Sequence, residues 1–281
     1  MTRHLQDLDR RTALQTVASA AVASFAGCLS QSSPASDGTT AAGGPLQQVA
    51  VDGTTVVVTL VSEADVDRLN LIQPNGELFA QQSVAAGVQQ VSFEIGTTYP
   101  PGEYDIVALR EDETIVETTI PIEPTLEIVE MGIGRNQPEE MWTGAEDKIS
   151  EEAFITVSNQ GTGPEAITKL LFIGDVPYPS NEQGTNYAGA EDVSGIYDSE
   201  TDSEVGEVLL PADEQLTIYS SRSPFAFVPG GGTSCTNEEQ TGKFDLILET
   251  RVGGDRVSKS YNIRYSASNE QEDCAITISE V

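Results

Sequence analysis

Short runs of β-branched and aromatic residues, separated by turn-forming residues, dominate the chain from Gln47 onward. No segment keeps a 3.6-residue apolar period over three helical turns, whereas runs such as Val56 to Val61, bounded by Gly, Pro, Asn or Asp, are typical of β-strands. The sequence therefore predicts an all-β fold. The predicted strands cover residues 49–51, 54–62, 68–73, 77–84, 90–95, 102–110, 114–122, 126–131, 153–158, 166–173, 215–220, 242–252, 256–265 and 275–279.

The spacing of these strands predicts two β-sandwich domains, at residues 47–123 and 124–281. The strands before residue 123 are sufficient for one sandwich, and prolines at 121 and 124 mark the boundary. The second domain contains a long polar insertion at about residues 174–206. Insertions of this length in a compact domain are usually functional or disordered, so we expect a partner surface there.

Three local motifs refine this picture. Pro74-Asn75-Gly76 between two strands predicts a hairpin turn, because Asn and Gly tolerate positive φ. The segment 101–109, PGEYDIVAL, resembles the penultimate strand of an immunoglobulin-like or fibronectin-like domain, where a Tyr near the strand start, here Tyr104, fixes the preceding corner. The segment 154–164, FITVSNQGTGP, looks like the strand and turn of adhesion-related CARDB-type sandwiches. These resemblances imply tandem immunoglobulin-like sandwiches, the second CARDB-like.

The first 28 residues have the layout of an export signal. A charged start is followed by a weakly apolar stretch that is shorter than the roughly 20 residues a membrane-spanning helix needs. Arg10-Arg11-x-x-Leu14 resembles a twin-arginine signal, and the residues FAGC ending at Cys28 resemble a lipobox, in which the cysteine becomes lipidated after cleavage. A soluble N-terminal helix is the other interpretation.

Together with the acidic composition, these motifs resemble the Tat-exported lipoproteins of haloarchaea. The resemblance implies a signal peptide at residues 1–27, a lipid on Cys28, and a position on the extracellular face of the cell membrane. Residues 28–46 are rich in Ser, Thr, Ala, Gly and Pro without an apolar period, so we expect a flexible linker between the lipid and the folded body.

The charge balance restricts the classes of partner. The chain carries 45 acidic and 14 basic residues and a formal net charge of -31. Phosphate neutralisation requires clustered Lys and Arg, and the only dense basic group lies in the first eleven residues, which excludes nucleic acid. At about 1 M salt the screening length falls to about 3 Å and self-repulsion nearly vanishes. We therefore expect a protein adapted to brine.

The residue inventory argues against most enzymes. His4 is the only histidine and lies inside the signal, which excludes serine and cysteine triads, histidine-containing zinc sites and blue-copper sites in the mature protein. Nucleophile-elbow, Walker and dinucleotide motifs do not occur. We expect no enzymatic activity. A carboxylate-based extracellular hydrolase is the weaker alternative, because paired carboxylates can cleave glycosides.

Cys235 and Cys274 form an even pair once Cys28 is assigned to the lipid. In an oxidising exterior this predicts a disulfide. Free redox thiols are the alternative, although neither cysteine belongs to a C-x-x-C motif.

Two further segments are candidate binding sites. In the run 198–204 the carboxylates alternate, so an extended strand would present them on one face to Ca²⁺ or Mg²⁺. A solvated acidic loop is the alternative, since the run departs from the EF-hand pattern. The run's carboxylates are Asp198, Glu200, Asp202 and Glu204. Phe225 and Phe227, between prolines at 224 and 229, form either a docking loop for a partner or a core-facing edge strand.

The sequence as a whole predicts a non-catalytic cell-surface lipoprotein that mediates protein or envelope interactions, or adhesion, through the loops of its sandwiches. An accessory ligand-binding lipoprotein of a transport or secretion system is the alternative. Both rest on fold-level analogy, and the identity of the partner is not encoded in any motif.

Overall fold

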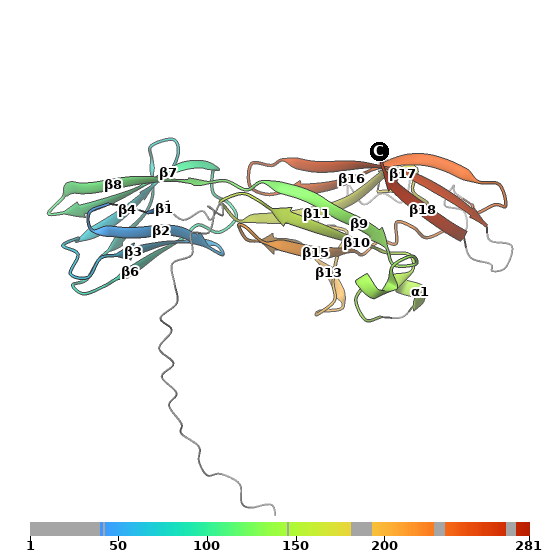
Figure 1. Ribbon diagram of the computed structural model, residues 1–281, viewed down its shortest axis with the longest axis horizontal. Coiled ribbons are helices and arrows are strands. Elements are labelled where there is room, and N and C mark those ends of the chain that lie inside the picture. The colour runs from blue at the N-terminus through green and yellow to red at the C-terminus, as the bar shows by residue number, and fades with distance from the viewer. Residues whose placement is uncertain (1–39, 42, 145, 181–192, 228–233, 268–273) are drawn as a thin grey trace, which may run out of the picture. The chain divides into compact units, whose positions relative to one another are not determined.

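The computed structural model describes residues 40–41, 43–144, 146–180, 193–227, 234–267 and 274–281 (Figure 1). Arg10, Arg11, Leu14 and Cys28, the predicted export and lipidation residues, lie outside this part of the chain. The described residues belong to one compact unit, Ser36–Val281, which contains two antiparallel β-sandwiches. Within them no helix is long and apolar enough to cross a membrane. The all-β prediction is confirmed.

The first sandwich packs two four-stranded sheets against each other. Strands carry alternating buried and exposed residues, as in β3, where Val56, Val58 and Leu60 point into the core. This period of two is what allows each sheet to bury one face. The first sheet has the order β1 (Thr40–Ala41), β2 (Leu46–Asp52), β3 (Thr55–Leu60) and β6 (Gln90–Glu94), and the second the order β5 (Leu78–Ser83), β4 (Arg68–Ile72), β7 (Gly102–Arg110) and β8 (Glu113–Ile122).

Both local predictions for this sandwich are confirmed. Gly76 has a φ of 83° in the turn that joins β4 to β5, and its N–H donates to the carbonyl of Gln73 at 2.8 Å. The Tyr104 side chain is fully buried, and its hydroxyl donates to the carbonyl of Pro100 at 2.8 Å. Tyr104 is thus a structural corner residue that ties the start of β7 to the preceding turn.

The second sandwich packs two five-stranded sheets. The predicted strands are present, but β12, β13 and β14, within and just after the predicted insertion, were not foreseen, because three residues are too few to show a period. One sheet has the order β13 (Ser203–Val205), β12 (Ile196–Asp198), β15 (Gln215–Ser220), β10 (Ala153–Asn159) and β9 (Leu126–Ile133). The other has the order β14 (Val208–Leu210), β11 (Glu165–Gly174), β16 (Gln240–Thr250), β17 (Arg256–Ala267) and β18 (Cys274–Glu280).

A buried asparagine organises the turn after β10. The Asn159 amide oxygen accepts hydrogen bonds from the N–H groups of Thr125 and Gly161, each at 3.0 Å, and its amide nitrogen donates to the carbonyl of Gly163 at 2.8 Å. A Cβ on Gly161 would lie 2.3 Å from the carbonyl oxygen of Glu123. Asn and Gly therefore shape this loop after a buried strand, as the sequence predicts.

Cys235 and Cys274 form the predicted disulfide, with Cα atoms 5.9 Å apart. The docking interpretation of the two phenylalanines is wrong, and the core-facing alternative is correct, although the segment is not a strand. Phe225 is fully buried, with its ring 5.7 Å from that of Phe172, and Phe227 packs 5.4 Å from Tyr265. Phe225 is part of the core and the partly buried Phe227 packs against it, because removing such large apolar groups from water is favourable.

Candidate functional site

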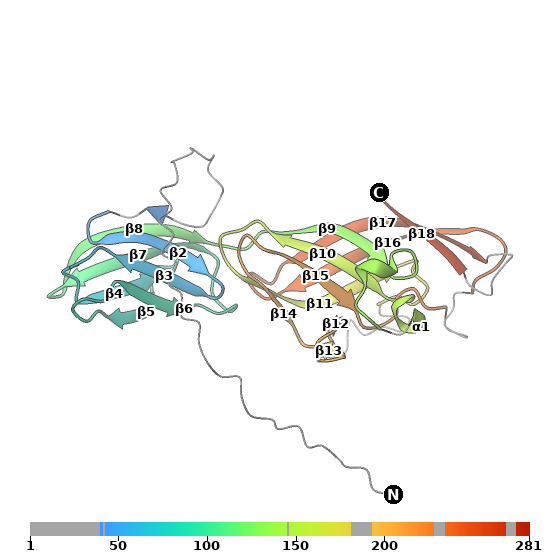
Figure 2. The same cartoon turned by 60° about the horizontal axis from the view of Figure 1, so that its bottom comes forward.

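A pocket of about 670 Å³ opens beside Trp142 in the second sandwich, and we call it the Trp142 pocket. Three segments build it: the β9–β10 connection, which contains the 3₁₀ turn Pro138–Glu140 and the helical turn α1 (Glu146–Ile149), the β12–β13 hairpin, and the residues after β15. Figures 1 and 2 show α1 and this hairpin projecting from the same side of the sandwich. The lining residues are Trp142, Thr143, Gly144, Lys148, Glu151, Glu152, Tyr197, Ser199, Asp202, Ser220, Ser221 and Ser223.

Glycine at the end of β9 allows the β9–β10 connection to fold back on itself. A Cβ on Gly134 would lie 1.9 Å from the carbonyl oxygen of Ile149, so no larger residue fits without displacing α1. The N–H of Gly134 donates to the carbonyl of Glu152 at 2.9 Å. The two ends of the β9–β10 connection, at Gly134 and Glu152, therefore lie side by side at the edge of the sheet.

A small hydrophobic cluster anchors the indole of Trp142. Met141, Ile149 and Phe154 are buried together, and Trp142 and Tyr219 pack against them while partly exposed. This cluster is separate from the main core of the sandwich. It fixes the tryptophan at the surface instead of leaving it to change rotamers in solvent.

Two tyrosines contact the indole from neighbouring strands. The ring centroid of Tyr197, on β12, lies 4.3 Å from that of Trp142 with a tilt of 35°, and Tyr219, on β15, makes an edge contact at 5.1 Å. Tyr197 and Tyr219 are directly paired across the two strands. The trio therefore combines side chains that are far apart in sequence into one rigid aromatic group.

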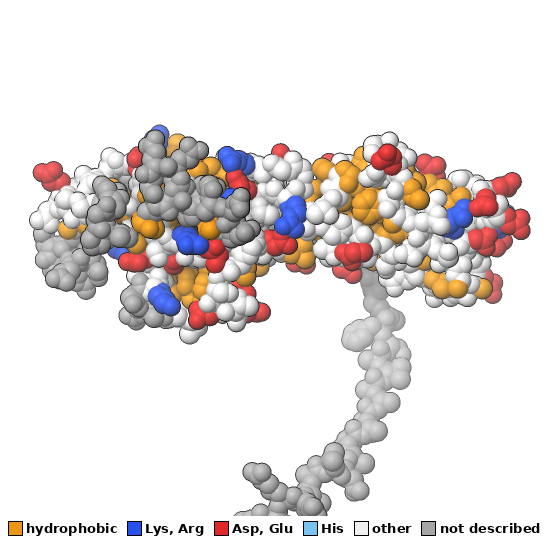
Figure 3. All heavy atoms as spheres, turned by 180° about the vertical axis from the view of Figure 1, so that it is seen from behind, with side chains coloured by type: hydrophobic (Ala, Val, Ile, Leu, Met, Phe, Trp, Pro, Cys, Tyr) orange, Lys and Arg blue, Asp and Glu red, His pale blue; other side chains and the backbone are white. Residues whose placement is uncertain are grey.

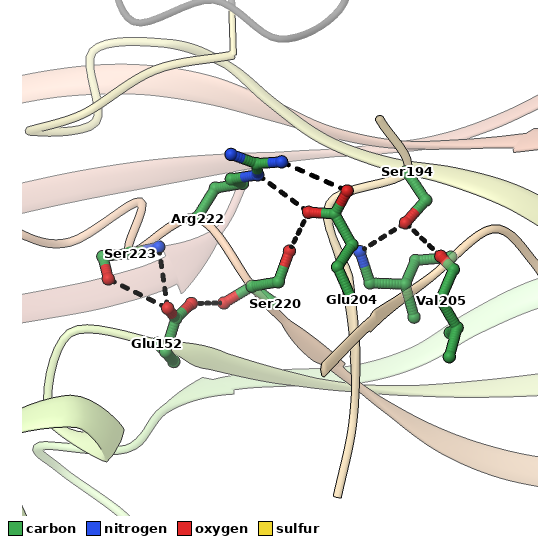
Figure 4. Close-up of polar contacts among 9 residues, drawn as sticks. Glu152, Ser194, Glu204, Val205, Ser220, Arg222 and Ser223 are labelled. Carbon is green, nitrogen blue, oxygen red and sulfur yellow. Dashed lines mark hydrogen bonds and ion pairs between the residues drawn. The ribbon is translucent and has the colours of Figure 1, made fainter. Parts of the chain in front are cut away.

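A buried carboxylate connects two of the three segments (Figure 4). Glu152 accepts hydrogen bonds from the N–H and hydroxyl of Ser223, at 2.8 and 2.9 Å, and from the hydroxyl of Ser220. The Ser220 hydroxyl in turn accepts from the N–H of Ala153 at 2.8 Å. Burial raises the pKa of Glu152, although these hydrogen bonds oppose the shift. Both oxygens are engaged by the protein itself, so Glu152 braces the pocket.

A second carboxylate holds the β12–β13 hairpin in place. Glu204 pairs with Arg222 at 2.8 Å and accepts from the hydroxyl of Ser221 at 2.6 Å, as Figure 4 shows for its contact with Arg222. Burial alone would raise the pKa of Glu204, but the hydrogen bonds from Arg222 and Ser221 outweigh it and lower the pKa. The hairpin is thereby linked to the residues after β15.

The predicted one-sided row of carboxylates does not exist. The run reverses direction in a turn, with Asp198 opposite Ser203 in the hairpin and Asp202 at a φ of 48°. Asp198 accepts from the N–H of Glu200 at 3.0 Å and from the hydroxyl of Thr201, while Glu204 is paired with arginine. Among the described residues, no group of three or more His, Cys, Asp or Glu side chains is arranged to hold a metal ion.

Asp202 has a different role at the rim of the pocket. Its Oδ1 accepts a hydrogen bond from the Tyr197 hydroxyl at 2.6 Å. This bond, followed by partial burial and the charge of Asp202, raises the pKa of Tyr197 to about 12. Asp202 thus orients the tyrosine that stacks on Trp142.

The insertion at residues 174–206 was the predicted partner surface, and it contributes Tyr197, Ser199 and Asp202 to the pocket. Residues 181–192 of it lie outside the described part of the chain. Sequence reasoning missed the contribution of Trp142. The signal was present: Trp142 is the only tryptophan, and it lies between the predicted strands 126–131 and 153–158, in residues 132–152.

No protein-family model and no curated protein matches the chain. Similar solved structures include a two-domain fibronectin type III segment of chicken tenascin, with 13% identity over 84% of this chain and 97% of that one and a TM-score of 0.25. The BSP domain of a biofilm-associated protein matches at 14% identity over 76% of this chain and 29% of that one, with a TM-score of 0.24.

A β-glucuronidase of glycoside hydrolase family 2 matches at 15% identity over 79% of this chain, with a TM-score of 0.22. The chain spans only 20% of that enzyme's length. The chain contains two antiparallel β-sandwiches in tandem.

Proposed function

We propose that the chain is an exported, lipid-anchored cell-surface protein of a halophilic archaeon that binds an envelope or extracellular component without catalysis. The observation that carries the proposal is the Trp142 pocket, in which a partly exposed aromatic group is held rigid beside hydroxyl and carboxylate side chains. Pockets of this size with convergent polar groups are the usual form of a ligand site.

The N-terminal pattern and the net charge support surface display in brine. The twin-arginine-like and lipobox-like motifs precede a linker, and the chain has 45 acidic residues but only 14 basic ones. On the face drawn in Figure 3 the Lys and Arg side chains are scattered rather than gathered into a patch. Such a surface favours hydrated cations as neighbours and disfavours polyanions.

The hydrogen bonds of Glu152 favour binding over hydrolysis. A glycosidase needs one carboxylic acid and one carboxylate that both face the scissile bond. The Glu152 oxygens instead accept hydrogen bonds from Ser220 and Ser223, which also line the pocket. We therefore keep the carboxylate-based hydrolase as the weaker candidate.

An accessory ligand-binding lipoprotein of a transport or secretion system is the second candidate, favoured by a pocket volume that suits a small ligand. Co-purification of the full chain with a membrane permease would support it. Co-purification with envelope polymer would support the first proposal.

Expression of the full chain in a haloarchaeal host tests the surface assignment. We expect the wild-type protein in the membrane fraction, accessible to protease on intact cells, and Cys28→Ser in the soluble fraction or the medium. Ser32→Ala, in the same linker, is the matched control and should remain membrane-bound. An unlipidated wild-type protein in the cytoplasm would contradict the proposal.

A further inference from the structure

We propose that the Trp142 pocket binds a neutral saccharide, with one face of a sugar ring stacked on the indole of Trp142. This inference rests on the proposed function, because it names the ligand class of the same site. It is argued from the aromatic geometry, the hydroxyl lining and the charges of the pocket.

The pocket suits an oligosaccharide end or a short glycan segment in size and polarity. Its volume of about 670 Å³ is within the range of small-ligand sites. Thr143 and Ser199 supply hydroxyl groups from two segments, and the Ser221 hydroxyl, which donates its hydrogen to Glu204, can still accept one from a ligand. A hydroxyl both donates and accepts hydrogen bonds, and so do the hydroxyls of a sugar, so the two surfaces can satisfy each other in several orientations.

The aromatic group provides the complementary apolar surface. A pyranose presents C–H groups on its ring face, and a flat aromatic ring is the side chain that covers such a face with little loss of conformational freedom. Trp142 is packed against Tyr197 at 4.3 Å and against Tyr219 at 5.1 Å, and it also packs against the buried cluster. The ring is therefore ordered before the ligand arrives.

The same geometry disfavours an organic cation. An aromatic cage encloses a quaternary ammonium within about 6 Å of several ring centroids, with the cation between the rings. Trp142 and Tyr197 contact each other directly at 4.3 Å, so no cation fits between them. The two rings are packed against each other and do not form a cage.

Charge disfavours an anionic ligand. Glu151, Glu152 and Asp202 line the pocket together with a single cation, Lys148. An anion in the pocket would lie beside these carboxylates, and charges in such close, partly buried contact are screened least by salt. A neutral ligand is not repelled by these carboxylates. Its stacking and hydrogen bonds also persist in molar salt, where contacts between exposed charges are screened.

Asp202 is the candidate acceptor for a sugar hydroxyl. Among the described residues the one hydrogen bond to its carboxylate is that from Tyr197 to Oδ1, and the side chain is exposed at the rim. The second oxygen can accept from the ligand while the first keeps Tyr197 in place. Asp202 would then contact the sugar and also hold Tyr197 against Trp142.

The single tryptophan gives the pocket its own reporter, because Trp142 is the only one in the chain. The full chain, solubilised in detergent in molar salt, is titrated with neutral oligosaccharides of glucose, mannose, galactose and N-acetylglucosamine while tryptophan emission is recorded. We expect at least one of them to produce a saturable change in emission, and oligomers of glucuronic acid and tetramethylammonium to produce none.

Two variants and a control locate the binding. Tyr197→Ala retains the reporter and should weaken affinity for the active saccharide by roughly tenfold, the order expected for one aromatic contact. Asp202→Asn should weaken it by several-fold, since it loses a charge-assisted acceptor. Leu78→Ala removes an exposed apolar residue of β5, in the first sandwich, and should bind like the wild type.

Absence of a saturable response to every neutral saccharide would overturn the inference, and so would a saturable response to tetramethylammonium or the acidic oligomers alone. Equal affinity in wild type, Tyr197→Ala and Asp202→Asn would place binding elsewhere and also overturn it. Each of these outcomes leaves the surface assignment to be judged separately by the Cys28→Ser fractionation.

Discussion

The backbone N–H and the hydroxyl of Ser223 both donate to one oxygen of Glu152, at 2.8 and 2.9 Å. The other oxygen accepts from the Ser220 hydroxyl. Glu152 precedes β10 and Ser223 follows β15, so this carboxylate joins two of the segments that line the Trp142 pocket. The integrity of the pocket therefore depends on a side chain that we do not expect to contact the ligand.

Replacement of this carboxylate should loosen the pocket. Glu152→Ala leaves the Ser223 N–H and the Ser220 hydroxyl without their acceptor, which should lower the free energy of unfolding by about 1–3 kcal/mol. Denaturant titration in molar salt measures the loss, and Trp142 emission reports the local change. Glu214→Ala, at an exposed glutamate, should stay within about 0.5 kcal/mol of wild type. Equal effects of the two variants would contradict the bracing role.

The raised pKa of Glu152 predicts a specific pH dependence. Burial raises it above the ordinary value of 4.5, so the folded state holds the proton more tightly than the unfolded state. The stability that this group contributes is fully present below pH 4.5 and is lost as the pH rises through the raised folded value. Relative to Glu152→Gln, the wild type should therefore lose unfolding free energy across that window. A constant or rising difference would exclude the assigned shift.

The two buried tyrosines Tyr104 and Tyr261 form a matched test of the corner. Tyr104→Phe loses the hydrogen bond to the carbonyl of Pro100 and should cost about 1 kcal/mol of unfolding free energy. The buried Tyr261 hydroxyl has no hydrogen-bond partner among the described residues, so Tyr261→Phe should be neutral or stabilising. Chemical denaturation of both variants decides, and a reversed order would refute the assignment of Tyr104 as a corner.

Gly134 should be essential to the position of α1. Its Cβ would overlap the carbonyl of Ile149, so Gly134→Ala should cost about 1–3 kcal/mol and alter Trp142 emission. Gly206→Ala is the control, because a Cβ there meets nothing within 4 Å. Unchanged stability and unchanged emission in Gly134→Ala would show that Gly134 and the carbonyl of Ile149 are not in close contact.

Removal of the disulfide should destabilise the second sandwich. The bridge closes a sequence separation of 39 residues, and the chain-entropy model assigns such a loop about 4 kcal/mol. Replacement of both cysteines by serine should lower the free energy of unfolding by up to that amount. Alkylation of the denatured, unreduced wild type should label neither Cys235 nor Cys274, and two labelled thiols would disprove the bridge in solution.

Much of the fold was predictable because its signals are local. The alternation of buried residues along the long strands, the Asn75-Gly76 turn and the corner at Tyr104 each depend on a few neighbouring residues. The disulfide prediction followed from the assignment of Cys28 to the lipid, which leaves Cys235 and Cys274 as a pair. None of these predictions depends on how distant segments of the chain pack together.

The pocket was not predictable because its parts come from distant segments. Trp142 meets Tyr197 only after the glycine at 134 folds the β9–β10 connection against the sheet. The run 198–204 suggested a cation site because we assumed that it is an extended strand. In the structure the chain turns at Asp202, so the carboxylates do not lie on one face. For Phe225 and Phe227 the sequence favoured burial over display but predicted an edge strand, because two apolar residues in a short segment do not distinguish a strand from a packed loop.

The most direct test of the account is retention of purified cell-envelope polymer from a halophilic archaeon by the immobilised full chain in molar salt. We predict that the wild type and Leu78→Ala retain the polymer equally, and that Trp142→Ala, confirmed as folded by its far-ultraviolet circular dichroism, retains at least tenfold less. Equal retention by folded Trp142→Ala would show that the Trp142 pocket is not the binding site.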